Sequence, residues 1–388
     1  MSNEFCPHCM QTIPGEASFC PVCGRDIDQC AAPHQLPIGA VLRGQSGHTF
    51  LFGEVKGDGG FGLTYIAKEL SSGRVVAIKE YFPLRCQPQR RSDLSVSPMT
   101  QMQEIYDRGM RSFLSEASML RAVRETPSIV HVMDYFEANG TAYMVMEYLN
   151  GTTLRDLMET QNRFEPNLLL KKVLPLMRDL AGIHTSGVLH RDIAPDNVML
   201  MPDGTLKLLD FGCARSMEDG KSMTVVLKPG FAPIEQYQTR GQGPYTDVYA
   251  LCATIYFCLT GKVPPAAPER LTATFDGRPD PLVPPSALGV PLSREQEELL
   301  LWGLSLQPTV RPQNMEELAS RLEKALPQTI WAPVPETEET EQDSIFITEP
   351  PAPREPFWRP LWRKYGLKLL LGAAGVVIVI LLLLLLLT

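Results

Sequence analysis

The fold of this chain is decided by residues 190–197, which read HRDIAPDN. Four further motifs flank this stretch: GDGGFG at 57–62 and VAIK at 76–79 precede it, and DFG at 210–212 and APIE at 232–235 follow it. Each motif alone is a weak signal, because a single charged residue is most often a solvated surface charge. Their occurrence together and in this order is not explained by chance, so one domain with a shared chemistry is predicted.

The glycine-rich motif at residues 57–62 matches G-x-G-x-x-G, a pattern found in more than one nucleotide-binding fold. A dinucleotide-binding fold needs a helix directly after the glycines, but residues 63–67, LTYIA, continue as a strand. A P-loop is excluded because no G-K-[ST] sequence follows. We therefore predict a hairpin whose glycines let the backbone approach phosphates closely.

The order of the predicted elements indicates a single α+β domain with two lobes over residues 48–326. Strand-like runs come first and helical patterns come later. These runs are 49–55, 63–67 and 74–79 for strands, and 168–184, 247–259, 294–304 and 314–325 for helices. Strands followed by helices predict a β-rich N-terminal lobe and a helical C-terminal lobe.

The ordered motifs resemble those of protein kinases, and the resemblance also includes Asp247 and Arg311. Within that family, the motif sequences GFGLTY, IKEYFP and APIEQY are similar to those of bacterial eukaryotic-like Ser/Thr kinases. The resemblance implies the bilobal protein-kinase fold. It also implies transfer of the γ-phosphate of ATP, with Mg²⁺ or Mn²⁺, to Ser/Thr hydroxyls of protein substrates.

The resemblance assigns a role to each motif residue. Asp192 would orient the substrate hydroxyl and accept its proton, Asn197 and Asp210 would hold Mg²⁺, and Lys79 would contact the α- and β-phosphates. The residues of the glycine-rich loop would cover the phosphates: Gly57, Gly59, Gly60, Phe61 and Gly62.

The same resemblance implies a partner for the lysine and a hinge for adenine. Glu116 is our candidate for the glutamate that pairs with the lysine; Glu104 is the alternative, because the stretch 80–111 is longer than usual for the family. The backbone of Glu147 to Leu149, after the gatekeeper Met146, would meet adenine.

Two features of the activation segment follow from the family pattern. Glu235 and Arg311 would form a buried ion pair that anchors this segment. Arg191, beside the catalytic aspartate, suggests control by a phosphorylated loop, because a guanidinium can bind phosphate bidentately. Thr224 is favoured over Ser216 and Ser222 as the modified residue, and Cys213 is either redox-sensitive or simply small and well packed.

Two positions depart from the pattern. Ala194 stands where Ser/Thr kinases usually carry a lysine, and LKPGFA at residues 227–232 replaces the common Gly-Thr-Pro. Our hypothesis is that Lys228 supplies the missing positive charge and stabilises the transition state electrostatically. The alternative is that Lys228 faces solvent or an acidic substrate.

Residues 1–27 are predicted to form a zinc ribbon. CPHC at 6–9 and CPVCG at 20–24 can supply four thiolates to one tetrahedral Zn²⁺, a structural site without an open position. The ligands would be Cys6, Cys9, Cys20 and Cys23. His8 lies inside the first pair and could replace a cysteine, but we expect it to be a solvated bystander. A pair of redox sites is disfavoured because no βαβ pattern surrounds it.

Residues 28–47 are predicted to be a linker, and residues 327–366 a disordered tether rich in Pro, Glu and Thr. The tether offers autophosphorylation sites that phosphothreonine-reading domains could bind; a simple spacer is the alternative. The four hydroxyl residues concerned are Thr337, Thr340, Ser344 and Thr348.

Residues 367–388 are predicted to be a transmembrane helix. Leu369 to Leu387 are uncharged and almost wholly aliphatic, and at about 1.5 Å per residue they span roughly 28 Å. Residues 358–368 carry Trp, Tyr, Arg and Lys, so the positive-inside rule places the ribbon and the kinase domain in the cytoplasm. We expect a single-pass anchor with nothing of substance beyond the membrane.

Composition narrows the remaining choices. A net charge of −8 argues against a nucleic-acid-binding surface, and nine cysteines fit a reducing compartment. A membrane tether would favour dimers that phosphorylate each other. Two other functions stay open: a pseudokinase or scaffold, suggested by Ala194, and a small-molecule kinase, for which the complete APIE segment is a poor match.

Overall fold

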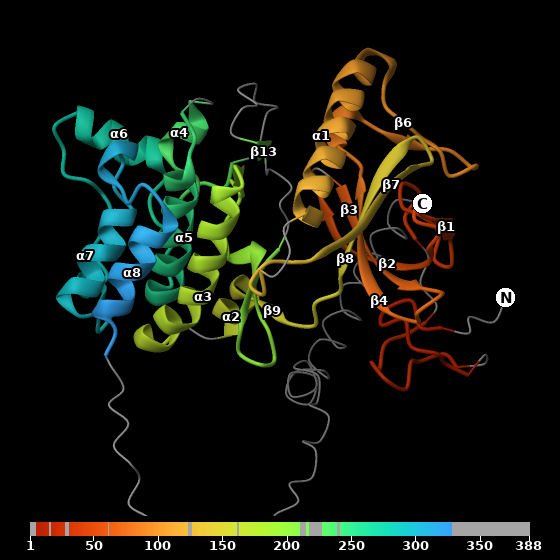
Figure 1. Cartoon of the computed structure of the whole chain (residues 1–388), viewed down its shortest axis with the longest axis horizontal. Coiled ribbons are helices and arrows are strands. Elements are labelled where there is room, and N and C mark those ends of the chain that lie inside the picture. Colours follow the sequence, from red (N-terminus) through yellow and green to blue (C-terminus); the bar gives the residue numbers. More distant parts are fainter. Residues whose placement is uncertain are drawn as a thin grey trace, which may run out of the picture. The chain divides into compact units, whose positions relative to one another are not determined.

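The structure is a computed structural model, and Figure 1 shows a β-rich lobe beside a helical lobe. It describes residues 5–14, 17–27, 31–60, 62–122, 126–160, 163–209, 215–216, 227–238 and 241–327. This confirms the predicted two-lobed α+β architecture, with strands before helices.

A six-stranded antiparallel sheet forms the N-terminal lobe. Its strands, in spatial order, are β1 (Val41–Arg43), β2 (Thr49–Gly59), β3 (Gly62–Glu69), β4 (Val75–Tyr81), β8 (Thr141–Glu147) and β7 (Val132–Ala138). β-Branched and aromatic side chains suit this half-buried surface, and Phe52 meets Tyr65 edge-on at 5.3 Å between ring centroids. The helix α1 (Gln103–Ala122) packs against β7 and β8.

The long stretch between β4 and α1 has a structure of its own. It contains a short hairpin between two 3₁₀ turns: η1 (Leu84–Cys86), β5 (Gln89–Arg90), β6 (Val96–Ser97) and η2 (Thr100–Met102). Arg90 reaches from this hairpin to the buried carboxylate of Glu80 at 2.6 Å. That carboxylate also accepts hydrogen bonds from Tyr65 (2.9 Å) and Tyr143 (2.8 Å). The stretch between β4 and α1 is thereby joined to the sheet through buried polar groups that are hydrogen-bonded to one another.

The C-terminal lobe is helical, and the four helices predicted in it are confirmed. They are α3 (Pro166–Thr185), α5 (Pro244–Thr260), α7 (Arg294–Gly303) and α8 (Met315–Ala325). Capping explains their ends: the Glu165 side chain accepts two backbone N–H groups of α3, and Gly261, with φ 72°, ends α5. α5 packs against α3, α7 and α8 and is buried from Thr246 to Thr260. It is the core helix of this lobe.

Shorter elements lie beside these helices. They are β9 (Thr152–Thr153), α2 (Leu154–Thr160), β10 (Val188–Leu189), η3 (Pro195–Asn197), β11 (Val198–Leu200), β12 (Leu206–Leu208), β13 (Arg215–Ser216), α4 (Ile234–Tyr237), α6 (Ala267–Phe275), η4 (Ser286–Leu288) and η5 (Pro308–Val310). β12 and β9 pair on either side of β11, and β10 pairs with β13. Residues 190–197 lie between β10 and β11.

The segment predicted as a linker, residues 28–47, is structured in the part that the structure describes. β1 lies within it and pairs with β2, and Leu36 is buried in the core of the lobe. A linker is therefore the wrong description of this part, because its backbone bonds and apolar side chain belong to the sheet. The predicted tether and transmembrane helix fall outside the described residues, and within those residues no helix has the length and hydrophobicity to cross a membrane.

Candidate active site

The catalytic loop, residues 190–197, is held in place by one buried carboxylate. Asp247 of α5 accepts the backbone N–H groups of His190 and Arg191, each at 2.8 Å, and is bonded to His184 Nε2 at 2.8 Å. Arg191 has a positive φ of 65°, a conformation that non-glycine residues adopt at a cost. The two N–H groups that converge on Asp247 stabilise this unusual turn.

Asp247 is suited to this role because it stays ionised. Burial alone would raise the pKa of its carboxyl, but the hydrogen bond to His184, the electrostatic influence of the His184 and His190 rings and the Arg191 N–H together lower the pKa below its ordinary value. A charged acceptor makes each of these hydrogen bonds stronger.

His190 connects the catalytic loop to the strand that leads to the DFG motif. Its Nδ1 accepts the N–H of Asp192 at 3.2 Å, and its Nε2 donates to the Leu209 carbonyl at 2.9 Å. The Leu209 N–H in turn donates to the Asn197 carbonyl at 2.7 Å. Asp210, the residue that follows, lies outside the described residues together with the rest of its motif. The structure thus places Leu209, the residue before Asp210, beside Asn197.

The carboxylate of Asp192 is the centre of the site. Asn197 Nδ2 donates to Asp192 Oδ2 at 2.9 Å and to the Asp192 carbonyl at 2.7 Å. Lys228 Nζ lies 3.2 Å from the same Oδ2, and both side chains are partly exposed, at 31% and 24%. Ala194 is fully buried. The structure thus joins Asp192, Asn197 and Lys228, which the sequence predicted to act together.

A further contact to this loop, made from α4, was missed by sequence reasoning. Gln236, in α4, donates from Nε2 to the carbonyl of Arg191 at 2.7 Å and is itself buried. Its position directly after the APIE motif was the only signal, because a glutamine has no distinctive chemistry by itself. The activation segment and the catalytic loop are therefore directly bonded.

Lys79 and its candidate partners lie in the N-terminal lobe. Lys79 is in β4, opposite Thr64 of β3, and is only 6% exposed. Glu116 is on the inner side of α1 and is 5% exposed, whereas the Glu104 side chain is 87% exposed and pairs with Arg108. Burial therefore favours Glu116 over Glu104 as the residue near Lys79.

The glycine-rich motif is a hairpin, as its sequence predicts. Gly57 pairs with Thr64 and Gly59 with Gly62 across β2 and β3, and Gly57, Gly59 and Gly60 are exposed at the tip. At Gly62, a Cβ atom would lie 2.2 Å from the Glu80 carbonyl oxygen, so only glycine fits there. Phe61 lies outside the described residues.

The predicted hinge follows β8. Met146 is buried, and Leu149 is half-buried against the core. The Glu147 carboxylate accepts the His131 N–H at 2.9 Å and meets Lys207 Nζ at 2.5 Å. The Glu147 side chain is thus occupied in joining the two lobes.

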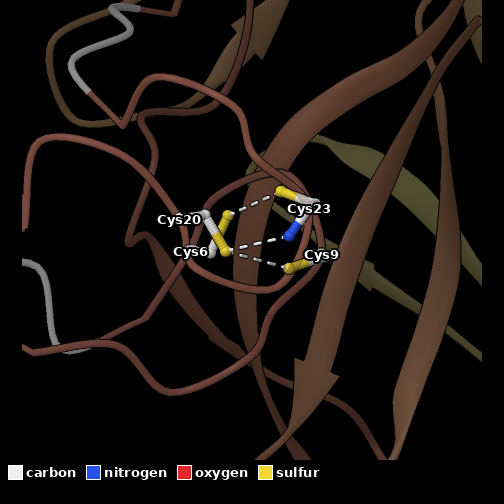
Figure 2. Close-up of side chains that lie close together, drawn as sticks. All are labelled: Cys6, Cys9, Cys20 and Cys23. Carbon is white, nitrogen blue, oxygen red and sulfur yellow. Dashed lines mark hydrogen bonds between the residues drawn. The ribbon is translucent and has the colours of Figure 1, made fainter. Parts of the chain in front are cut away.

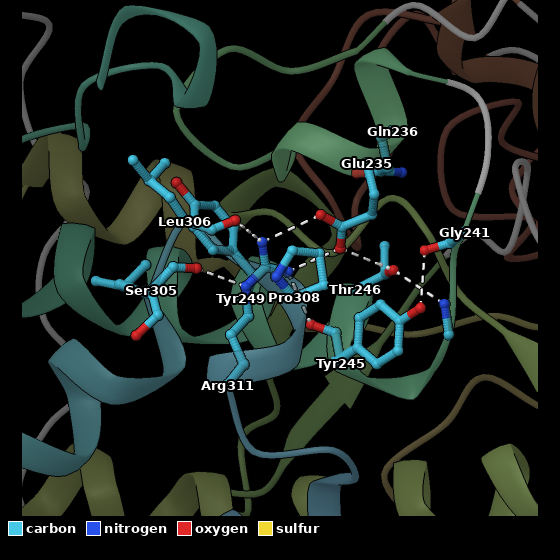
Figure 3. A network of polar contacts seen from close by, with 12 residues as sticks. Glu235, Gln236, Gly241, Tyr245, Thr246, Tyr249, Ser305, Leu306, Pro308 and Arg311 are labelled. Carbon is cyan, nitrogen blue, oxygen red and sulfur yellow. Dashed lines mark hydrogen bonds and ion pairs between the residues drawn. The ribbon is translucent and has the colours of Figure 1, made fainter. Parts of the chain in front are cut away.

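The ion pair predicted between Glu235 and Arg311 is confirmed. Figure 3 shows the two side chains facing each other, with Nη1–Oε1 and Nη2–Oε2 distances of 2.7 and 3.1 Å. Arg311 also donates to the carbonyls of Ser305 and Leu306, and Glu235 accepts the Thr246 hydroxyl at 3.0 Å. Both charges are buried and satisfied, so the pair fixes the end of the activation segment to the C-terminal lobe.

The four cysteines of residues 1–27 form a compact cluster (Figure 2). Their sulfur atoms lie within 4.8 Å of one another, with Cys6–Cys23 and Cys9–Cys20 both at 3.7 Å. Tetrahedral Zn²⁺ with Zn–S bonds of about 2.3 Å would separate its sulfur ligands by roughly 3.8 Å. The cluster therefore fits a zinc ion in size and chemistry.

The expectation for His8 is wrong. Instead of being solvated, His8 is 3% exposed and its imidazole is bonded to Glu54 Oε2 at 2.5 Å and to the Asp26 carbonyl at 2.7 Å. Both ring nitrogens face oxygen atoms rather than the sulfur cluster. His8 is therefore a packing residue between the ribbon and β2, and its ring does not take the place of a cysteine in the cluster.

Comparisons with known proteins agree with this geometry. Serine/threonine-protein kinase PknB of Mycobacterium tuberculosis is 31% identical over 280 residues, which cover 70% of this chain and 42% of the relative. A probable serine/threonine-protein kinase of Streptomyces coelicolor is 30% identical, covering 72% of this chain and 40% of the relative. The chain thus spans less than half the length of these curated relatives.

A solved structure, "PpkA-294 apo form", is 34% identical with a TM-score of 0.63, and the match covers 74% of this chain and 99% of that one. The family model described as "Protein kinase domain" matches residues 50–321, which is most of the chain. These residues include every described motif of the site. The chain therefore belongs to the protein kinase domain family.

Proposed function

We propose that this chain is an ATP- and Mg²⁺-dependent protein kinase that phosphorylates Ser/Thr hydroxyls of proteins. The observation that carries the proposal is the carboxylate of Asp192, held by Asn197 and met by Lys228, on a loop anchored by Asp247. Both curated relatives described above bear the name serine/threonine-protein kinase, which supports the choice of acceptor.

The chemistry follows from charge and position. Asp192 accepts the proton of the substrate hydroxyl, while the Asn197 amide keeps its carboxylate oriented. Asn197 and Asp210 would hold Mg²⁺, which offsets the charge of the phosphates when bound. Lys79 would contact the α- and β-phosphates, and the glycine-rich hairpin would cover them. Mn²⁺ has similar preferences for oxygen ligands and is an alternative ion.

Lys228 takes the electrostatic role that Ala194 does not fill. Its ammonium lies 3.2 Å from the Asp192 carboxylate, at the place where the hydroxyl and the transferring phosphoryl group would meet. A fixed positive charge there stabilises the negative charge of the transition state. In this chain the activation segment would thus supply the positive charge that the family usually carries in the catalytic loop.

The variant Asp192→Asn tests the activity. It should abolish γ-phosphate transfer to protein acceptors, because the amide cannot accept the proton, while the fold and nucleotide affinity stay close to wild type. Transfer should be measured with radiolabelled ATP on protein and on small-molecule acceptors. A wild-type chain that binds nucleotide without transfer would be a scaffold, and transfer to small molecules alone would make it a small-molecule kinase.

We further propose that the cysteine cluster holds a structural zinc ion and that residues 367–388 anchor the chain in a membrane, with the ribbon and kinase domain in the cytoplasm. The cluster geometry supports the first part. The apolar run and its basic, aromatic flank support the second. Membrane anchoring would concentrate chains for trans-autophosphorylation as dimers, and the tether would offer sites for phosphothreonine-reading domains.

Fractionation tests the anchor. The full chain should sediment with membranes and resist extraction by salt, because an apolar helix is held by the hydrocarbon core rather than by charge. A chain ending at residue 326 should be found in the supernatant at comparable expression. Equal amounts of both chains in the supernatant would contradict the membrane assignment.

A further inference from the structure

The ribbon is bonded to the strand that leads into the glycine-rich hairpin. The register between β2 and β3 shifts between Phe52 and Val55, so Gly53 and Glu54 leave the regular ladder. The Glu54 N–H, released there, donates to the Pro7 carbonyl of the ribbon at 2.9 Å. A β-bulge commonly redirects a strand in this way, and here it makes a backbone bond to another element.

The contact at this bulge is close enough to require glycine. A Cβ atom at Gly53 would lie 2.4 Å from the Pro7 carbonyl oxygen, 2.7 Å from Met10 Sδ and 2.9 Å from Ile66 Cγ2. Met10 is fully buried. The Pro7 carbonyl and the Met10 side chain of the ribbon therefore pack directly against the backbone of β2 at Gly53.

The side chain of Glu54 ties both halves of the ribbon to the same point. Its carboxylate meets His8 Nδ1 at 2.5 Å, Arg25 Nη1 at 3.1 Å and the neighbouring Lys56. His8 comes from the first cysteine pair and Arg25 from beyond the second. The His8 ring also bonds to the Asp26 carbonyl at 2.7 Å, which joins the two halves to each other.

The chain that follows the ribbon is attached to β3 and to the β5–β6 hairpin. The Leu36 N–H donates to the Tyr65 hydroxyl at 3.0 Å, and Arg90 donates to the His34 carbonyl at 3.0 Å. Tyr65 and Arg90 both bind Glu80, which is adjacent in β4 to Lys79. The ribbon and its connection thus contact β2 and β3, which form the glycine-rich hairpin, and are linked to β4, which carries Lys79, through Tyr65 and Arg90.

We propose that the ribbon positions the glycine-rich hairpin for nucleotide binding, with Glu54 as the positioning residue. Gly57, where the hairpin tip begins, is three positions from Glu54 in the same strand, and glycines restrict their own conformation least. When the base of the strand is held, the tip samples fewer conformations before nucleotide binds. It therefore loses less conformational entropy when it closes over phosphates. The inference rests on the proposed function only in taking those phosphates to be ATP.

Two variants of the full chain test the proposal. Glu54→Ala removes the shared carboxylate, and Gly53→Ala forces a methyl group against the Pro7 carbonyl. Each should raise the Kd for Mg–ATP roughly three- to ten-fold, because less of the hairpin is preorganised. Each should also speed hydrogen exchange in residues 54–64, a readout that does not depend on phosphate transfer.

Two matched controls carry substitutions outside the ribbon and β2. Glu137→Ala removes an exposed glutamate of β7, at the opposite edge of the sheet, and Gly182→Ala adds a methyl group where no atom lies within 4 Å. Both should match wild type in nucleotide affinity and in exchange of the hairpin. Glu54→Gln, which keeps the shape of the side chain, provides a variant that should fold if Glu54→Ala does not.

The outcomes separate this proposal from the proposed function. Unchanged exchange in residues 54–64 for all Glu54 and Gly53 variants that fold would overturn the positioning role. If the wild-type chain fails to bind Mg–ATP, the proposed function fails, but faster exchange in the variants would still support coupling between ribbon and hairpin. Slower phosphate transfer with unchanged Kd and exchange would also refute the proposal.

Discussion

At the scale of single residues, the main feature is the replacement of a charge. Position 194 holds a buried alanine, and because alanine is uncharged the catalytic loop has no cation two residues after Asp192. Lys228 instead reaches the Asp192 carboxylate from the activation segment. An ammonium in this position can act on a developing negative charge wherever its side chain begins, because electrostatic stabilisation depends on the final location of the charge.

Lys228→Ala should reduce kcat with a peptide substrate by about 10²-fold and change the peptide KM little, since one preorganised donor at the reacting group contributes that much. Lys228→Arg should retain part of the rate, because the charge remains. Steady-state kinetics with a Lys324→Ala control, an exposed lysine of α8, gives the comparison. An unchanged kcat/KM for Lys228→Ala would show that the lysine has no role in transfer.

At the scale of elements, the activation segment is joined to its surroundings at α4. Glu235 binds Arg311 near the C-terminal end of the domain, and the next residue, Gln236, bonds to the catalytic loop. A four-residue helix cannot be stable alone, so these contacts determine where α4 lies. One short element thereby connects the stability of the lobe with the geometry of the active site.

Glu235→Ala should lower the free energy of unfolding by about 3–5 kcal/mol, because it leaves the guanidinium of Arg311 buried without its counter-charge. Chemical denaturation measures this change. Glu323→Ala removes the partner of Arg178 in a pair that is about half exposed, and should cost less than about 1 kcal/mol. Similar losses for the two variants would contradict the assignment of Glu235 as the anchor.

At the scale of the whole molecule, the described residues of the ribbon lack an adequate core of their own. Its buried apolar cluster consists of Cys6, Ile13, Cys20 and Ile27. So few side chains supply too little hydrophobic free energy to fold the segment, so zinc and the contact with β2 must supply the rest.

Cys9→Ser should therefore abolish stoichiometric zinc binding, measured by elemental analysis, and lower the Tm of the N-terminal lobe. Hydrogen exchange of residues 5–27 should rise to the rate of unstructured chain, because metal binding and folding are coupled. Cys30→Ser, which changes the next cysteine in the sequence, serves as the control and should keep the zinc content of wild type. A Cys9→Ser chain with full zinc content would exclude the four-cysteine site.

Local patterns in the sequence were enough to predict the two-lobed fold, the glycine-rich hairpin and the four cysteine ligands. Strand and helix periodicity is a property of neighbouring residues, and a C-x-x-C pair brings its sulfurs together within one turn. The ion pair of Glu235 and Arg311 was also predictable, but only through the family resemblance.

Tertiary structure alone decided the remaining questions. Glu116 is buried and Glu104 is exposed. Lys228 lies beside Asp192. His8, expected to be a solvated bystander, is bonded to Glu54. Each of these results depends on contacts between elements far apart in the chain, and the periodicity of one segment says nothing about which distant segment packs against it. The motif HRDIAPDN thus indicated Asp192 as the proposed proton acceptor, whereas the fold determined which cation stands beside its carboxylate.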